Sequence, residues 1–169
     1  MASCNAGSVE VDVALGAHPR TVIADLEEIE GRTYPARRRT QNLVGGPSPI
    51  QAANFAMGFV TLEPNGGQVP WHNQKQDEVY FLVEGEAEMC LGTERVTLTA
   101  GQAVRSPSGV FHQMTNRGDK VAKMIYVYGP AGDVDHWKQE LGGTLPEAGE
   151  GGIPPLPEGA YPQYTDNPE

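Results

Sequence analysis

Apolar and polar residues alternate in short runs along the middle of the chain, a pattern typical of strands with one buried face. From Asn54 onward, Gly-, Pro- and Asn-containing turn signals separate these runs, at residues 65–67, 85, 92–93, 101, 107–109 and 117–119. The pattern gives about six or more short, evenly spaced strands with no helical stretch between them. It predicts an all-β fold, an antiparallel barrel or jelly roll. The sequence contains no internal repeat, so we expect one barrel.

The two ends of the chain lack this pattern. Residues 9–13 alternate apolar and acidic side chains and predict a short strand, whereas residues 21–29 fit either a strand or a turn of helix. Residues 133–141 predict a short helix with Trp137 and Leu141 on one side. The Gly- and Pro-rich segment that follows is expected to cover either the barrel mouth or a dimer seam. The predicted divisions are an N-terminal arm (1–40), a barrel (41–130) and a C-terminal helix and arm (131–169).

Side-chain parity along the predicted strands gives an expected cavity lining, because residues two apart face the same way. In the predicted strand 121–128, the charged Lys123 is taken to face outward. In the strand before residue 66, the alternate residues with the bulkier side chains are taken to face the cavity. The expected substrate-binding residues, all apolar or aromatic, are Phe55, Met57, Phe59, Tyr80, Met114, Met124 and Tyr126. Such a cavity suits an organic substrate with a flat or hydrophobic part. The alternative is that these side chains simply fill a small barrel.

The composition of the chain bears on the classes of molecule that it can bind. A formal net charge of −10 opposes binding to nucleic acid and to anionic membrane surfaces, so we expect a small-molecule substrate. The two cysteines, Cys4 and Cys90, have no CxxC spacing, which favours a reducing cytoplasm. The uncharged run 43–62 is broken by Gly and Pro, so no membrane span is expected. The basic run 37–39 is interpreted as a solvated turn.

Residues 66–85 gather side chains that suit a metal ion. In a strand, His72 and Gln74 project from the same face. The polar residues 75–77 can turn the chain, so that Glu78 begins an antiparallel neighbour and returns a carboxylate to the same point. Imidazole and carboxylate groups converging from adjacent strands are what a divalent metal requires.

A second stretch supplies another imidazole. Residues 107–109 predict a turn and residues 110–116 a strand that carries His112. His136, in the C-terminal segment, is interpreted as a surface residue.

The two stretches resemble the two sequence motifs of the cupin superfamily. Nine of ten motif positions agree, namely Gly66, His72, Glu78, Gly85, Gly101, Pro107, Gly109, His112 and Asn116. The tenth is Gln74, which stands where the family usually has its second histidine. The resemblance implies a single jelly-roll barrel with a divalent metal held by His72, Gln74, Glu78 and His112. It also implies a homodimer, since leading segments in such families often cross onto a second subunit.

Two imidazoles and one carboxylate are typical of non-haem Fe(II) oxygenases, in which open positions take substrate and dioxygen. Fe(II) is therefore the expected metal, with Mn(II), Ni(II) and Zn(II) as alternatives. The H-x5-E spacing, followed by aromatic residues and a Glu-Gly turn, is also similar to ring-cleaving cupin dioxygenases related to 3-hydroxyanthranilate dioxygenase. This chain lacks the C-terminal cysteine pairs that some of those enzymes carry.

Three functions follow. The first is an Fe(II) dioxygenase acting on a small enol, diketone or hydroxylated aromatic. The second is a redox-neutral lyase or isomerase, in which the metal polarises a carbonyl and Glu78 or Tyr80 assists with a proton. The third is a cupin that binds a small molecule without catalysis. The expected catalytic residues are Glu78, Tyr80 and Tyr126.

Overall fold

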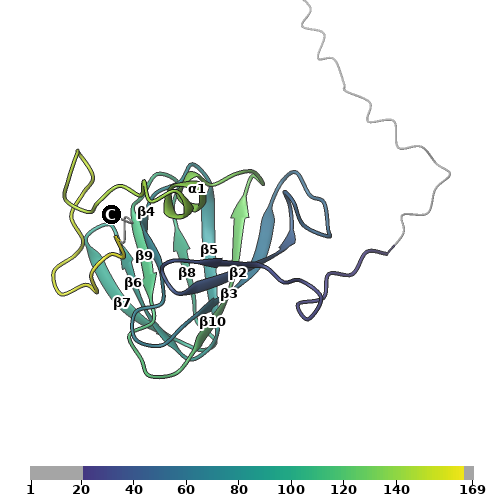
Figure 1. The fold of residues 1–169 in the computed structure, drawn as a ribbon, viewed down its shortest axis with the longest axis horizontal. Helices are drawn as coiled ribbons and strands as arrows, with labels where there is room; N and C mark the ends of the chain where they lie inside the picture. Colours follow the sequence, from purple (N-terminus) through teal and green to yellow (C-terminus); the bar gives the residue numbers. More distant parts are fainter. Residues whose placement is uncertain (1–20, 166–169) are drawn as a thin grey trace, which may run out of the picture.

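The computed structural model describes residues 21–165. Its strands form two antiparallel sheets that pack face to face (Figure 1). One sheet has six strands, in the order β1 (Arg32–Tyr34), β2 (Arg38–Val44), β3 (Ala56–Leu62), β10 (Ala122–Gly129), β5 (Asp77–Glu84) and β8 (Ala103–Ser106). The other has four, in the order β4 (Gln68–His72), β9 (His112–Thr115), β6 (Glu86–Leu91) and β7 (Glu94–Thr99). The predicted all-β jelly roll is thereby confirmed.

The described segment before the first sheet contains one turn. The predicted strand at 9–13 lies outside the described residues, and residues 26–28 form a turn. In that turn the backbone N–H of Ile29 donates to the carbonyl of Asp25. Strand β2 begins at Arg38 and so crosses the expected boundary at residue 41.

The core lies between the two sheets, and the six-stranded sheet shows the expected alternation. On β5 the side chains of Tyr80 and Leu82 are buried, and on β10 those of Met124, Tyr126 and Tyr128 are buried. Burying a side chain of this size contributes about 1.5–3 kcal/mol to folding. Parity along these two strands is therefore as predicted from the sequence.

The parity predicted for β3 is wrong. Alternate residues beginning at Ala56 face the core, whereas Met57 and Phe59 are only partly buried on the opposite face and Phe55 is exposed. Met57 and Phe59 lie opposite Val127 and Ile125 of β10, which also face outward. The bulkier side chains of β3 therefore face away from the core.

A single aromatic ring explains why the inner side of β3 is small. Tyr126 lies opposite Gly58 in the register of β10 and β3, and its hydroxyl reaches past β3 to donate to Oδ1 of Asn42 on β2, at 2.6 Å. A Cβ atom at Gly58 would lie 2.5 Å from the Tyr126 ring. The inner parity of β3 thus leaves room for a side chain that comes from β10.

The strands β4 and β5 are not the antiparallel neighbours that the sequence predicts. β4 pairs with β9, whereas β5 pairs with β10 and β8, so the chain crosses from one sheet to the other between His72 and Asp77. His72 and Glu78 therefore meet across the sandwich instead of along one sheet.

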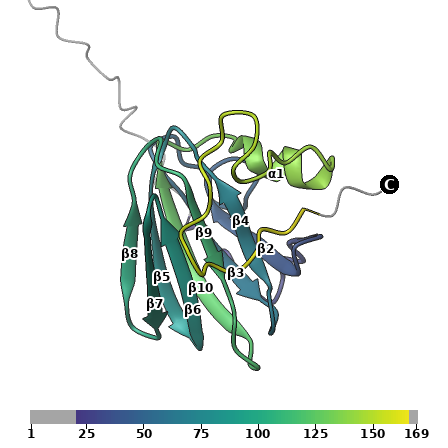
Figure 2. The same ribbon diagram turned by 90° about the vertical axis from the view of Figure 1, so that its left-hand side faces the viewer.

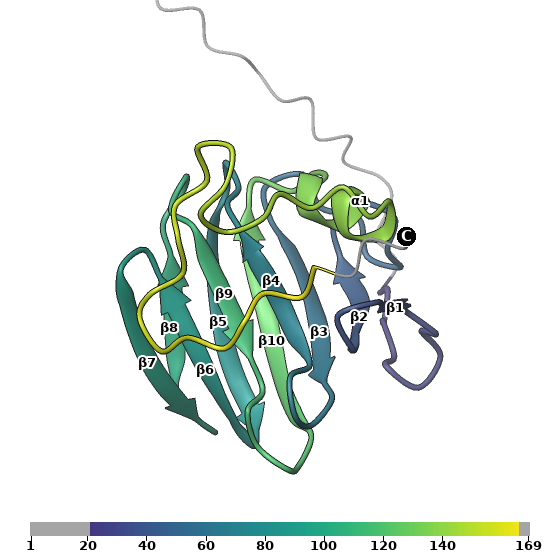
Figure 3. The ribbon, with the colours of Figure 1, turned by 60° about the vertical axis from the view of Figure 1, so that its left-hand side comes forward.

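The C-terminal arm covers the outer face of the four-stranded sheet, where the trace passes in front of β6, β9 and β4 (Figure 3). Every residue of β4 and β9 is buried as a result. The indole N–H of Trp71 donates to the carbonyl of Pro154 at 2.9 Å, and the backbone N–H of Tyr164 donates to Oε1 of Gln68 at 2.8 Å. Burial on both faces hides the alternation that identified the other strands.

The predicted helix forms at Asp135–Leu141 (α1) and lies over one end of the sandwich (Figure 2). Its buried side chains are His136 and Glu140, whereas Leu141 is 46% exposed and Trp137 packs partly buried against the core. The guanidinium of Arg38 contacts the Glu140 carboxylate at 2.7 Å, with both side chains 1% exposed. Arg38 is thus buried within the run interpreted as a solvated turn, because strand alternation points it inward. Within residues 21–165, no helix has the length and apolar character needed to cross a bilayer.

Replacing Gly58 with Ala should push the Tyr126 ring out of place, because the new methyl group would lie 2.5 Å from it. We expect a loss of about 1–3 kcal/mol in the free energy of unfolding, measured by urea denaturation. Gly118→Ala is the matched control, since its nearest atom outside its chain neighbours lies at 3.4 Å, and it should change stability by less than about 0.5 kcal/mol. Equal stability of the two variants would contradict the packing described for Tyr126.

Candidate metal centre

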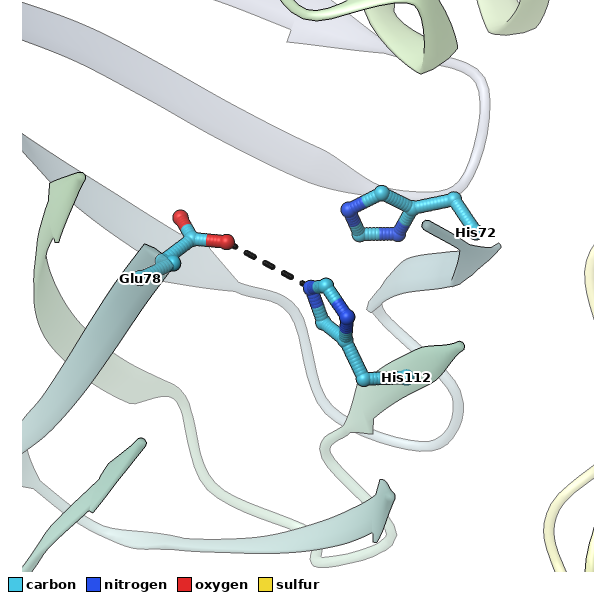
Figure 4. Close-up of side chains that lie close together, drawn as sticks. All are labelled: His72, Glu78 and His112. Atoms are coloured by element: carbon cyan, nitrogen blue, oxygen red, sulfur yellow. Dashed lines mark ion pairs between the residues drawn. The ribbon is translucent and has the colours of Figure 1, made fainter. Parts of the chain in front are cut away.

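Three ligand-type side chains converge between the sheets (Figure 4). His72 on β4 lies directly opposite His112 on β9, and Glu78 reaches them from β5 of the facing sheet. Their ligand atoms all lie within 4.8 Å of one another, and all three residues are buried. Nε2 of His112 is 3.4 Å from Oε2 of Glu78. The structure thus brings together three of the four residues predicted as metal ligands.

Backbone carbonyls orient both imidazoles toward this point. Nδ1 of His72 lies 2.7 Å from the carbonyl of Pro70, and Nδ1 of His112 lies 2.9 Å from the carbonyl of Val110. Because a carbonyl only accepts, each Nδ1 carries the proton and each Nε2 keeps a free lone pair. This is the tautomer that a metal-ligating histidine needs.

The converging atoms also lack hydrogen-bond partners. Nε2 of His72, Nε2 of His112 and Oε2 of Glu78 are all buried and unpaired. Leaving a buried polar atom unpaired costs about 1–3 kcal/mol. A divalent cation would compensate all three atoms at once, and two imidazoles with a carboxylate form a suitable donor set. The residues present therefore fit the metal that the sequence predicts.

Burial sets the protonation of the groups around this point. It lowers the pKa of His72 well below the usual value, and the neighbouring His112 adds to the effect. His72 is therefore neutral, as a metal ligand must be. Burial, together with the Glu78 carboxylate, raises the pKa of Tyr80 well above its usual value. The Tyr80 phenol is a proton donor near neutral pH, not a base.

Gln74 lies beside His72, as its place in the sequence predicts. Its side chain interacts with the His72 imidazole, and its Nε2 atom is buried without a hydrogen-bond partner. Gln74 and Glu78 both line a small inner cavity of ≈ 20 Å³. That volume holds about one water-sized group.

A larger outer cavity of ≈ 680 Å³ adjoins the inner one. Residues that line both cavities are Thr40, Tyr126, Tyr128, Val134 and Trp137. Small-molecule sites usually have volumes of about 300–1,000 Å³, so the outer cavity is large enough for an organic substrate and the inner one is not.

The rings of Tyr126, Tyr128 and Trp137 form an aromatic wall between the two cavities. The two tyrosine rings stack at 5.7 Å with an interplanar angle of 10°, and Trp137 meets them edge-on at 6.2 and 6.3 Å. Burial raises the pKa of Tyr128 to about 12, and its hydroxyl donates to the carbonyl of Gly132 at 2.7 Å. The aromatic wall is therefore neutral and held by hydrogen bonds and ring contacts.

The structure places the residues expected to bind substrate in three different surroundings. Tyr80 lines the inner cavity and Tyr126 lines both. Met114 and Met124 face inward as predicted but are fully buried in the hydrophobic core, outside the linings of both cavities. Those on or next to β3, which are Phe55, Met57 and Phe59, lie on the other face of the sheet.

His136 was not recognised from the sequence as part of the site, and its interpretation as a surface residue is wrong. It is 4% exposed, and its ring lies against that of His72, with centroids 3.7 Å apart and an interplanar angle of 35°. Burial, and next the His72 imidazole, lower its pKa well below the usual value. The available signal is the four-residue spacing from His136 to Glu140, which places two polar side chains on one helical face.

Residues 58–128 match the family model described as a cupin domain. Over 113 residues the chain is 28% identical to polyketide synthase CurC of Streptomyces cyaneus, covering 66% of this chain and 71% of that protein. It is 25% identical over 84 residues to the tetracenomycin polyketide synthase protein TcmJ of Streptomyces glaucescens, covering 50% of this chain and 56% of that protein.

A solved structure has the same fold. The Cupin 2 conserved barrel domain protein from Salinispora arenicola CNS-205 superposes with a TM-score of 0.52 at 24% identity, covering 73% of this chain and 98% of that one. The match over residues 58–128, together with the motif residues that join the two sheets, supports a cupin superfamily protein.

Proposed function

We propose that this protein is a metal-dependent enzyme that binds an enolisable diketone or a hydroxylated aromatic in its outer cavity, and that it is a dioxygenase. The observation that carries the proposal is the set of three buried, unpaired ligand atoms on His72, Glu78 and His112. Glu78 lines the inner cavity, which shares the aromatic wall with the cavity of ≈ 680 Å³, whereas His72 and His112 are outside the linings of both. A divalent ion held by these three residues would polarise a substrate carbonyl and, as Fe(II), would supply electrons to dioxygen.

The substrate class rests on the cavity and on the relatives. Stacked tyrosine rings and an edge-on tryptophan favour a flat, conjugated molecule. Two relatives carry polyketide synthase names, and chains of ketone groups are enolisable. A substrate with two adjacent or β-related oxygens would present both toward His72, Glu78 and His112.

Three protein groups would handle protons and orientation. The Tyr80 phenol, kept protonated by burial, donates to an oxygen that gains negative charge. Glu78 supplies a carboxylate to the ion. The Tyr126 hydroxyl is held by Asn42 at 2.6 Å, which fixes its ring as one side of the substrate path. Tyr126 thus acts mainly by positioning the substrate.

Dioxygen chemistry is favoured by the number of protein ligands. Two imidazoles and one carboxylate leave positions for two substrate oxygens and for dioxygen. Fe(II) is the metal we expect in the native protein, with Mn(II), Ni(II) and Zn(II) as alternatives.

A redox-neutral lyase or isomerase reaction is the second candidate. It is favoured by the polyketide synthase relatives, because ring closure and bond cleavage in polyketones need a polarised carbonyl and a proton donor, and no oxidant. Tyr80 would then supply the proton. Small-molecule binding without catalysis is the third candidate.

Replacing His112 with Ala should abolish binding of about one divalent ion per chain, since it removes one of the three converging ligand atoms. His112 is fully buried, so circular dichroism checks that the variant keeps the fold. Elemental analysis of the purified proteins measures the ion content. Asn73→Ala, an exposed change beside His72, is the control and should keep the metal. Equal metal content in wild type and His112→Ala would refute the site.

Turnover should require dioxygen. Screening diketones and hydroxylated aromatics for oxygen uptake by the Fe(II)-loaded protein gives the first measurement. Any substrate found is then tested under strict anaerobiosis, where turnover should cease. An unchanged anaerobic rate would assign the protein to the lyase or isomerase class.

The predicted homodimer has a candidate interface on the outer face of the six-stranded sheet. Phe59, Ile125 and Phe81 lie side by side across β3, β10 and β5, and Phe81 is 40% exposed. A continuous apolar strip of this kind is typical of an interface. We expect light scattering to give a dimer for wild type and a monomer for Phe81→Lys. Thr97→Lys, an exposed change on β7, should remain dimeric, and a monomeric wild type would refute the prediction.

A further inference from the structure

His136 lies at the metal centre with no partner for either ring nitrogen. Both Nδ1 and Nε2 are buried and unpaired. His72 and His112 differ in this respect, because each has its Nδ1 atom at hydrogen-bond distance from a backbone carbonyl. A histidine that serves only to fill a core normally has at least one such partner. Its free nitrogens therefore indicate that another group binds there.

The placement of α1 brings His136 to this position. Arg38 on β2 and Glu140 on α1 form a buried ion pair at 2.7 Å, one turn along the helix from His136. Burial raises the pKa of Glu140 even though Arg38 opposes the rise. A buried ion pair is weak evidence for stability, because desolvation offsets much of the attraction. It does fix geometry, and here it holds the helix with His136 facing His72.

The strand that carries His72 lacks a second histidine. Gln74 projects beside His72 at the position where the cupin motif usually supplies another imidazole. An amide oxygen is a weaker donor than an imidazole nitrogen. His136 and Gln74 both line the inner cavity, together with Glu78. An imidazole is thus available from α1 close to where the segment after β4 offers only an amide.

We propose that His136 is a fourth protein ligand of the metal, supplied by α1 in place of the histidine that Gln74 replaces. The inference rests on the proposed metal site. His136 stands outside the 4.8 Å cluster of His72, Glu78 and His112, so its ring must tilt off the His72 ring to coordinate. Gln74 is then free to hydrogen-bond the substrate.

The fourth ligand bears on the reaction. With His136 as a further ligand, the protein would supply three imidazoles and a carboxylate, which would leave fewer positions for substrate and dioxygen than the three-residue set. Dioxygen would then need a position vacated by His136. Access of dioxygen to the ion would therefore depend on the placement of α1.

Zn(II) alone is the probe. The affinity for Zn(II) is measured by competition with a chromophoric chelator, and the number of imidazoles around the ion by X-ray absorption spectroscopy. We expect three imidazoles in wild type and two in His136→Ala, with affinity weakened at least about 10- to 100-fold, the loss typical of removing even an outer partner of a ligand. Gln74→Ala is the matched variant and should keep three imidazoles, with a smaller loss of affinity.

The outcomes separate this inference from the proposed function. Wild type with two imidazoles, or His136→Ala with unchanged affinity, would overturn the role of His136 and leave the three-residue site intact. Wild type that binds no Zn(II) would overturn both. His136→Gln preserves more of the buried volume and gives the same comparison where His136→Ala fails to fold. A purely structural role would lower the stability of the metal-free protein and leave the imidazole count of wild type at two.

Discussion

Two imidazole lone pairs and a carboxylate oxygen, all buried and unpaired, face one another between the two sheets. At this range they repel, and a divalent cation among them turns the repulsion into attraction. The groups come from both layers, with His72 and His112 on one sheet and Glu78 on the other. Ion binding therefore acts on the separation of the sheets as well as on the ligands, and it couples to folding.

The surroundings of this centre keep water away and keep the protein's own groups neutral. Burial shifts the pKa values of His72 and His136 downward and that of Tyr80 upward, so each favours its uncharged form. Arg38 and Glu140, two other buried side chains, pair with each other. A dry, neutral setting strengthens the pull of an ion on a substrate oxygen.

The sequence predicted the fold class and the convergence of His72, Glu78 and His112, because the glycine and proline turns and the spacing of these three residues are local features. Parity on β5 and β10 was also predictable, since Glu78 marks the inner face of β5 and Lys123 the outer face of β10. On β3 both faces are apolar, and the choice depends on Tyr126, a residue far along the chain that needs the space at Gly58. Local patterns do not contain that information.

Two further differences have the same origin. The pairing of β4 depends on β9, which follows about forty residues later. The short polar segment after His72 was therefore predicted to form a hairpin, whereas in the structure it crosses from one sheet to the other. His136 lies against His72 on a helix that is held by tertiary contacts, among them the buried pair of Arg38 and Glu140. Such tertiary contacts leave little trace in the periodicity of a short helix.

The C-terminal arm has a consequence for assembly. A two-layer fold has two outer faces, and here the arm occupies one of them through contacts such as those of Trp71 with Pro154 and of Gln68 with Tyr164. Within the described residues, the outer face of the six-stranded sheet is free of this arm. Association through a single self-complementary face would close on a two-fold axis, so stacking would stop at two copies and would not extend into a filament.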